Sequence, residues 1–235
     1  MPLRENGSSD PPLSVIVPAR NEAGTITDTL ARLREPEVLE VLVVDGGSDD
    51  ATVDLARPLA DRVIEAPEGR ARQMNAGAEV ARGELLFFLH ADTKPPEGFA
   101  SAIVHACRYA IGGRFDVELD APGLAYRVIE TAINVRSRWS GVFTGDQGLF
   151  VRRDVFESLG RYPDQPLLED LALARAMKRR GPTAALRLRV RTSARRWQRH
   201  GVVRTVLLMW WIRSLAAAGV EPAKLAELYR DDRRG

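Results

Sequence analysis

The chain has little of several features that would assign it to a class at once. Cys107 is its only cysteine, which excludes an internal disulfide and a cysteine-rich zinc site and suits a reducing cytosol. No uncharged segment reaches the roughly 20 residues that a transmembrane helix needs. The formal net charge is only +2, from 34 Lys and Arg against 32 Asp and Glu, so the overall charge indicates no partner.

The N-terminus also lacks an apolar core of the length that a signal peptide needs. We therefore expect a flexible leader over residues 1–12 and a cytoplasmic protein. The length of 235 residues and the hydrophobic content of 45% suit one large α/β domain over residues 13–200, followed by a helical tail over residues 201–235. Arginines gather after Arg175, and this basic third suits phosphates, nucleic acid or anionic lipid.

The first hundred residues alternate between strand-like and helix-like segments. Apolar runs predict strands at residues 13–19, 40–45, 61–66 and 84–92, and helical spacing or capping predicts helices at residues 24–33, 49–60 and 69–83. Such alternation indicates a mostly parallel sheet with helices on both faces. Right-handed crossovers would then bring the carboxyl ends of these strands to one edge, where open α/β sheets bind ligands.

Polar residues follow three of these strands, at residues 18–22, 45–50 and 90–92. Asp92 comes just past a buried strand, and two prolines follow it. A carboxylate there suits a hard cation such as Mg²⁺ or Mn²⁺, which takes one or two protein oxygens and completes its shell with substrate phosphates. The alternatives are a cap for the helix expected at residues 97–106 or a solvated turn.

Asp45 ends another strand and is followed by two glycines, which allow a backbone to approach a ligand closely. Its carboxylate suits hydrogen bonds from a base or a ribose, whereas Asp50 suits the N-cap of the next helix. Arg70 and Arg72 stand near an expected helix start, where N–H groups and guanidinium meet phosphate. The alternative for this segment is a solvated helix.

These clusters together resemble a known family. The segments "VPARNE", "VVDGGSDD", "GRARQMNAG" and "FLHAD" occur in the order and spacing of inverting glycosyltransferases of family 2, which have the GT-A fold. The segments "GDQGLFVRRDVF", "LEDLALARAMKRRG" and "SARRWQRHG" extend the resemblance over residues 14–201. The sequence is most similar to a small bacterial branch, the radical-SAM/selenodomain-associated transferase 2 proteins.

The resemblance implies a GT-A domain with a nucleotide-sugar half at residues 13–107 and an acceptor half at residues 108–200. Its implied donor-nucleotide residues are Pro18, Arg20, Glu22, Asp45, Asp49, Arg70, Asn75 and Ala91. Asp92 matches the last acid of the family's DxD motif, the metal ligand, whereas His90 replaces the first acid. A neutral imidazole can itself bind Mn²⁺, so His90 is either a second ligand or part of the pocket wall.

On the acceptor side, Asp170 matches the acid that acts as general base and takes the proton of the attacking hydroxyl. The alternative is that Glu169 and Asp170 only favour the first turn of a helix. The resemblance implies that an acceptor or diphosphate pocket is shaped by Asp146, Gln147, Glu169, Arg196 and Trp197. For Arg195, Arg196 and Trp197 the alternative is a solvated basic face.

The expected activity is inverting, metal-dependent transfer of a sugar from a nucleotide-diphosphate sugar to a hydroxyl acceptor. UDP is expected more than GDP, Mn²⁺ or Mg²⁺ as cofactor, and a glycan, lipid or small molecule as acceptor, with no nucleic-acid partner. Nucleotidyltransfer would need a glycine-rich phosphate loop after the first strand, which "VPARNEAGT" lacks. A third hypothesis is a non-catalytic module that binds nucleotide or membrane through its tail.

Trp210 and Trp211 lie in an apolar helix predicted over residues 201–219, between Arg204 and Arg213. This pattern permits a peripheral membrane contact of an interfacial helix. Core packing or a homodimer interface is favoured over that contact.

Overall fold

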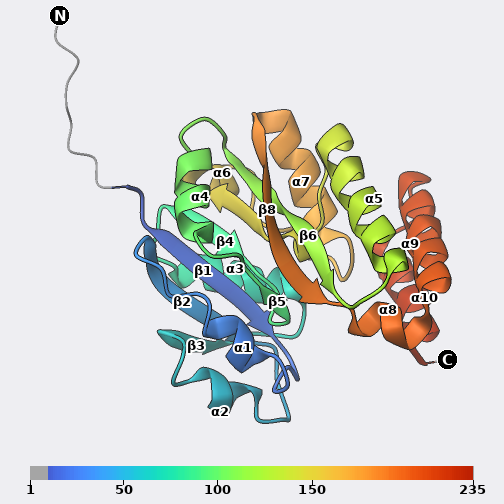
Figure 1. Cartoon of the computed structure of the whole chain (residues 1–235), viewed down its shortest axis with the longest axis horizontal. Helices are drawn as coiled ribbons and strands as arrows, with labels where there is room; N and C mark the ends of the chain where they lie inside the picture. The colour runs from blue at the N-terminus through green and yellow to red at the C-terminus, as the bar shows by residue number, and fades with distance from the viewer. Residues whose placement is uncertain (1–9, 235) are drawn as a thin grey trace, which may run out of the picture.

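The computed structural model describes residues 10–234, which form an α/β fold around one eight-stranded sheet. The strands are β1 Leu13–Ala19, β2 Val38–Asp45, β3 Arg62–Glu65, β4 Leu85–Phe88, β5 Thr93–Lys94, β6 Gly112–Asp120, β7 Leu149–Arg152 and β8 Thr183–Ser193. Their order in the sheet is β3-β2-β1-β4-β7-β6-β8-β5. The predicted α/β sheet is therefore confirmed, and Figure 1 shows how it runs through the molecule.

The first four strands in that order are parallel and carry apolar residues on both faces. Their side chains alternate between two cores, as the period of two in a strand requires. Val15 and Val17 of β1 face one core, whereas Ile16 between them faces the other. The first core is covered by α1 Ile26–Leu30, α2 Thr52–Ala56 and α4 Phe99–Ala106; the second is covered by α3 Arg70–Val80, α6 Arg153–Ser158 and α7 Glu169–Arg180. Helices thus cover both faces of the sheet.

The sheet changes direction at β7, which is antiparallel to both β4 and β6. Beyond it, β6 and β8 form a long parallel pair. The second half of β6 is also bonded to α5 Leu124–Ser140. The Asn134 amide accepts the Val117 N–H at 2.9 Å and donates to the Val117 carbonyl at 3.0 Å. These bonds fix α5, and with it the acceptor half, against the sheet.

One predicted strand is shorter than expected. The apolar run at residues 84–92 forms β4 only as far as Phe88, and the chain then turns, with the Thr93 N–H donating to the His90 carbonyl at 3.0 Å. Thr93 and Lys94 form the two-residue strand β5, which pairs with β8 rather than continuing beside β1. His90 and Asp92 therefore lie in a turn between two strands, which frees their side chains from the sheet.

The C-terminal part consists of α8 Arg195–His200, α9 Val202–Ala217 and α10 Pro222–Arg234. Figure 1 shows α9 and α10 side by side beyond α5. Ile212, Leu225 and Tyr229 form a small core between them. The core packing favoured for Trp210 and Trp211 is wrong, since their exposed fractions are 71% and 48%. Within residues 10–234 no helix is long and apolar enough to cross a membrane.

Candidate active site

The carboxyl ends of β1 and β2 meet at one edge of the sheet, where Ala19 lies opposite Asp45. The Asp45 side chain is buried and accepts hydrogen bonds from the backbone N–H groups of Gly47 and Ser48, both at 3.0 Å, and from the Ser48 hydroxyl. Gly47 has a φ of +84°, a conformation that glycine adopts without strain. Asp45 therefore holds the loop after β2 in shape in addition to its predicted role at the nucleotide.

Gln73 also shapes this edge, although sequence reasoning missed it. Its buried amide donates to the carbonyls of Ala19 and Val44 at 2.9 and 2.8 Å, and so joins α3 to the ends of β1 and β2. A Cβ on Gly46 would lie 2.9 Å from the Gln73 amide, so the loop needs glycine there. A glutamine on the inner face of a helix gives no sequence signal of this kind, because its partners are backbone atoms of distant strands.

The loops after β1 and β2 are bonded to each other. The Asn21 N–H donates to the Ser48 hydroxyl, and the Asp49 N–H donates to the Asn21 side chain, both at 3.0 Å. Asp50 accepts from the Thr52 N–H at 2.9 Å at the start of α2, consistent with the predicted N-cap role. The two loops thus form one rigid rim along the edge.

Asp92 lies in the turn after β4, beside an arginine from the C-terminal part of the chain. The Arg195 guanidinium donates to Glu22 at 2.6 Å and to Asp92 at 3.3 Å, which raises the pKa of Arg195. Arg195 therefore ties the loop after β1 to the turn after β4. The alternative of Asp92 as a cap for α4 is wrong, since Glu35 accepts the N–H bonds of Gly98 and Ala100 at that helix start, at 2.7 and 2.9 Å.

Asp92 fits a divalent-metal site that the substrate completes. Its side chain is 24% exposed, and Arg195 is its only charged partner among the described residues. Within residues 10–234 no three His, Cys, Asp or Glu side chains gather closely enough to enclose a metal ion. A hard cation held here would therefore take Asp92, with His90 as the predicted second ligand, and would need phosphate oxygens from the donor to complete its shell.

His90 stands at the centre of the site, among charges from both halves. Burial lowers the pKa of its imidazole, and Arg70 lowers it further, whereas Asp92, Asp146 and Asp170 act in the opposite direction. The imidazole is consequently neutral at pH 7. Because a Cβ on Gly145 would lie 2.9 Å from His90 Nε2, the ring packs directly against that glycine, which favours the pocket-wall role of His90.

Asp170 is the acid at the start of α7 and lies on the acceptor side of His90. Its carboxylate accepts the Gly145 N–H at 2.7 Å and the Leu171 N–H at 2.7 Å. Gly145 begins the 3₁₀ helix η1 Gly145–Gln147, so the loop before β7 fixes the orientation of this carboxylate. Asp146, the next residue, accepts a hydrogen bond from the Thr144 hydroxyl.

Glu169 precedes Asp170 and is almost fully buried. Burial raises the pKa of the Glu169 carboxyl to about 7, and the charge of Asp170 raises it further, whereas Arg70 opposes the shift. Burial therefore favours the neutral form of Glu169, whereas the Asp170 carboxylate accepts two backbone N–H groups. Arg70, exposed at the first position of α3, acts on both His90 and Glu169 and so faces the centre of the site.

The sequence and the fold agree with known proteins. The family model described as "Glycosyl transferase family 2" matches residues 14–160, which is more than half of the chain. The chain belongs to glycosyl transferase family 2. The matched residues include Asp45 and Asp92, the two acids described above.

Curated relatives of this family 2 chain bear glycosyltransferase names. The "PGL/p-HBAD biosynthesis glycosyltransferase" of Mycobacterium tuberculosis is 32% identical over 65% of this chain and 63% of its own length. "Probable glycosyltransferase YdaM" of Bacillus subtilis is 30% identical over 72% of this chain and 47% of its own length. The chain thus spans about half to two thirds of these relatives.

Solved structures show the same fold at lower identity. The mannosyltransferase PcManGT of Pyrobaculum calidifontis, solved with GDP-Man and Mn²⁺, has a TM-score of 0.61 at 22% identity, covering 78% of this chain and 57% of its own. TarS of S. aureus, solved with UDP-GlcNAc, has a TM-score of 0.60 at 18% identity, covering 77% and 58%. Both likenesses bear out the predicted GT-A fold.

Two predicted residues of this family 2 site lie differently from expectation. The Asn75 amide pairs with the backbone of Tyr162, at 2.9 and 3.1 Å, so its polar atoms join α3 to the loop before α7. Gln147 has no exposed surface and bonds to Ser137 at 3.1 Å. Because Gln147 is fully buried, it can shape the predicted acceptor pocket only by supporting η1, and this role stays a prediction.

The predicted Arg-Trp pair, Arg196 and Trp197, also lies away from the sheet edge that carries Asp45 and Asp92, called the donor edge below. The Arg196 guanidinium stacks 4.3 Å from the centre of the Tyr229 ring on α10, and Trp197 packs on the small core around Leu119 and Ile129. The side chain that reaches the edge is the preceding residue, Arg195. The donor-nucleotide roles of Arg20, Pro18 and Ala91 stay predictions. Arg20 is exposed and pairs with Glu68. Pro18 is buried near the end of β1, and Ala91 is buried in the turn after β4.

Proposed function

We propose that the chain transfers a sugar from a nucleotide-diphosphate sugar to a hydroxyl acceptor, with inversion at the anomeric carbon. The observation that carries this proposal is the convergence of two acids on one ring. Asp92 from the donor half and Asp170 from the acceptor half both act electrostatically on His90. A Cβ on Gly145 would lie 2.9 Å from His90 Nε2 and 3.6 Å from an Asp170 oxygen, so His90 and Asp170 border the same glycine. This arrangement supports a leaving-group site at Asp92 and a general base at Asp170.

In this proposal Asp170 accepts the proton of the acceptor hydroxyl as the hydroxyl oxygen bonds to the anomeric carbon and the nucleotide diphosphate leaves. A single displacement of this kind inverts the carbon, and it needs no protein nucleophile. The Gly145 N–H holds the carboxylate in position. The donor diphosphate would lie near Arg70 and Arg195, and Asp45 would contact the nucleotide.

Mn²⁺ or Mg²⁺ would be held by Asp92 and would neutralise charge on the departing diphosphate. His90 would form part of the pocket wall, as its packing on Gly145 favours. UDP is the proposed nucleotide, ahead of GDP. Structural relatives support both, because glucosyl-3-phosphoglycerate synthase of Mycobacterium tuberculosis was solved with Mn²⁺ and UDP, whereas the mannosyltransferase was solved with GDP-Man. The choice of UDP therefore rests on the experiment below.

The test is a panel of UDP- and GDP-sugars, with and without Mn²⁺, read by thermal shift and by release of nucleotide diphosphate. A true donor raises the melting temperature by mass action. Asp170→Asn should lower turnover by about 10²–10⁴-fold, the contribution of a general base, and keep UDP binding. Asp92→Asn should lose both the metal-dependent binding and the turnover.

The exposed Asp54 on α2 offers a matched control, since Asp54→Asn removes the same charge at a position with no predicted role in the site. If Asp170→Asn keeps full turnover while Asp54→Asn also does, Asp170 is not the base. If no nucleotide raises the melting temperature, the proposal of a nucleotide-sugar donor fails as a whole.

Three finer predictions remain part of this proposal. They are membership of the radical-SAM/selenodomain-associated branch, a cytoplasmic location and the division of the chain at residues 107 and 200. The proposed membrane contact or homodimer is supported by an exposed apolar face on α9, formed by Val203, Leu207, Trp210 and Trp211. Sedimentation with and without vesicles tests both, because Trp210→Ala should weaken whichever association exists.

A further inference from the structure

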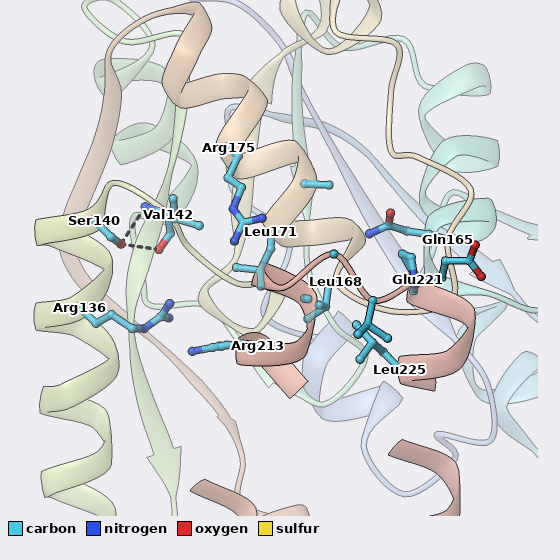
Figure 2. A pocket seen from close by; sticks show the side chains of 15 residues that line it. Arg136, Ser140, Val142, Gln165, Leu168, Leu171, Arg175, Arg213, Glu221 and Leu225 are labelled. Carbon is cyan, nitrogen blue, oxygen red and sulfur yellow. Dashed lines mark hydrogen bonds between the residues drawn. The ribbon is translucent and has the colours of Figure 1, made fainter. Parts of the chain in front are cut away.

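Three arginines from three helices line one cavity at the start of α7. Arg136 comes from α5, Arg175 from α7 and Arg213 from α9, and the cavity has a volume of about 520 Å³. In Figure 2, Arg136 and Arg213 face each other across the cavity, and Arg175 points toward the same end. Gln165 and Glu221 lie at the opposite end.

Two of the three guanidinium groups have a buried nitrogen atom without a partner, whereas Arg175 is exposed. The Arg136 Nη2 and Arg213 Nε atoms are buried without a hydrogen bond, and none of the three arginines forms an ion pair within residues 10–234. Burial lowers the pKa of Arg136, and the nearby charge of Arg213 lowers it further. Unpaired buried charge costs free energy, so this arrangement is costly unless an anion completes it.

The cavity and the proposed general base share the start of α7. Leu168 and Leu171 line the cavity, whereas Glu169 and Asp170, which lie between them in sequence, do not. The charges of Asp146 and Asp170 act on Arg136 and partly oppose its pKa shift, so the acids and the guanidinium are within electrostatic reach. None of the donor-edge residues lines this cavity, which separates it from the proposed nucleotide site.

We infer that this cavity binds the acceptor, and that the acceptor carries a phosphate group which Arg136, Arg175 and Arg213 hold. A phosphate monoester has up to two negative charges and three acceptor oxygens, which suits three guanidinium groups. Val220, Pro222 and Leu225 make the rest of the wall apolar, so a hydrocarbon part of the acceptor fits beside the phosphate. This inference rests on the proposed function, since it names the acceptor class of that site.

The test uses hexyl phosphate as the probe, on the full chain, with binding measured by calorimetry. Hexyl phosphate should bind, whereas 1-hexanol should not, and inorganic phosphate should bind more weakly than hexyl phosphate. Arg136→Gln and Arg213→Gln should each weaken binding by at least about tenfold, the loss expected for one charge-assisted hydrogen bond. Arg57→Gln, at an exposed position after α2, is the matched control and should leave binding unchanged.

A second measurement guards against variants that fail to fold. Because Arg136 and Arg213 repel each other without an anion, Arg136→Gln should keep or raise the melting temperature of the free protein while it lowers the stabilisation by hexyl phosphate. A variant with a lower melting temperature and unchanged hexyl phosphate affinity would assign Arg136 a structural role and overturn the inference.

A third arm separates a soluble acceptor from a lipid one. Phosphatidylcholine vesicles with and without phosphatidic acid replace hexyl phosphate, and capture that depends on Arg136 indicates a membrane-borne phosphate. Binding of neither probe overturns the inference. UDP with Mn²⁺ is titrated in parallel. If UDP binds and the phosphate probes do not, only the acceptor inference fails. If the phosphate probes bind and UDP does not, the donor proposal fails and the phosphate site stands.

Discussion

The donor edge and the arginine cavity differ in how many of their polar side chains already have hydrogen-bond partners. At the donor edge, Asp45, Gln73 and Asn21 are already bonded to the backbone or side chains of neighbouring loops. In the cavity, Arg136 and Arg213 present buried nitrogen atoms that have no partner among the described residues. The first region is built before any ligand arrives, and the second region leaves charge to be satisfied.

This difference assigns different tasks to the two regions. A rim whose bonds are complete offers a ligand a fixed shape and little ordering cost on binding. A pocket with uncompensated charge favours one class of ligand strongly, because an anion relieves repulsion as well as forming hydrogen bonds. Neither His90 nor Gly145 lines the arginine cavity, so changes there should act on the proposed base rather than on that cavity.

Among the changes compared below, the largest effect is expected at Gly145. Gly145→Ala places a Cβ 2.9 Å from His90 Nε2 and 3.6 Å from an Asp170 oxygen, so the imidazole must move and the base loses its position. We expect turnover to fall by about 10²-fold, the scale of a 1 Å misplacement, with UDP binding weakened less. Gly24→Ala is the control, since a Cβ there meets no atom within 4 Å. Equal turnover of both variants would contradict the role of Gly145.

The donor edge alone is tested at Gln73. Gln73→Ala removes two hydrogen bonds to the ends of β1 and β2, and we expect a loss of about 1–3 kcal/mol in the free energy of unfolding. Urea unfolding measures it, with Gln198→Ala on the exposed face of α8 as control. If UDP affinity falls without a change in stability, Gln73 contacts the ligand and does not support the rim.

The acceptor side is tested through pH at Glu169. Because the pKa of Glu169 is about 7 in the folded chain and higher than in the unfolded chain, ionising it costs stability as pH rises from about 4.5 to 7, and the cost is complete above pH 7. Glu169→Gln should match the wild type near pH 4.5 and exceed its stability by about 3 kcal/mol at pH 8. The exposed Glu97, changed to Gln, should show no such pH-dependent difference.

The smallest effect is expected where the C-terminal part touches the donor edge. Arg195 is about half exposed, so Arg195→Gln should lower stability by less than about 1 kcal/mol. Its loss should weaken UDP–Mn²⁺ binding more at low than at high salt, because exposed ion pairs are screened. Arg32→Gln on the surface serves as control. Salt-independent weakening would indicate that Arg195 touches the nucleotide directly.

The sequence by itself determined the donor half. Strands β1 to β3 and the helices between them follow from apolar periodicity, and Asp45 and Asp92 stand next to strand ends in short, contiguous segments. Local signals of this kind survive folding because each residue acts beside its neighbours in the chain. The base role of Asp170 is predicted by the family resemblance alone, since the acidic pair at residues 169–170 by itself equally fits the first turn of a helix.

Only the tertiary structure decided which distant side chains meet. It selected Arg195 over Arg196 for the donor edge, buried Gln147, and assigned the Asn75 amide to the backbone of Tyr162. It also gathered Arg136, Arg175 and Arg213, which lie about forty residues apart on three helices. No periodicity or motif links such residues, since their proximity depends on how α5, α7 and α9 pack, and packing is a property of whole surfaces rather than of local sequence.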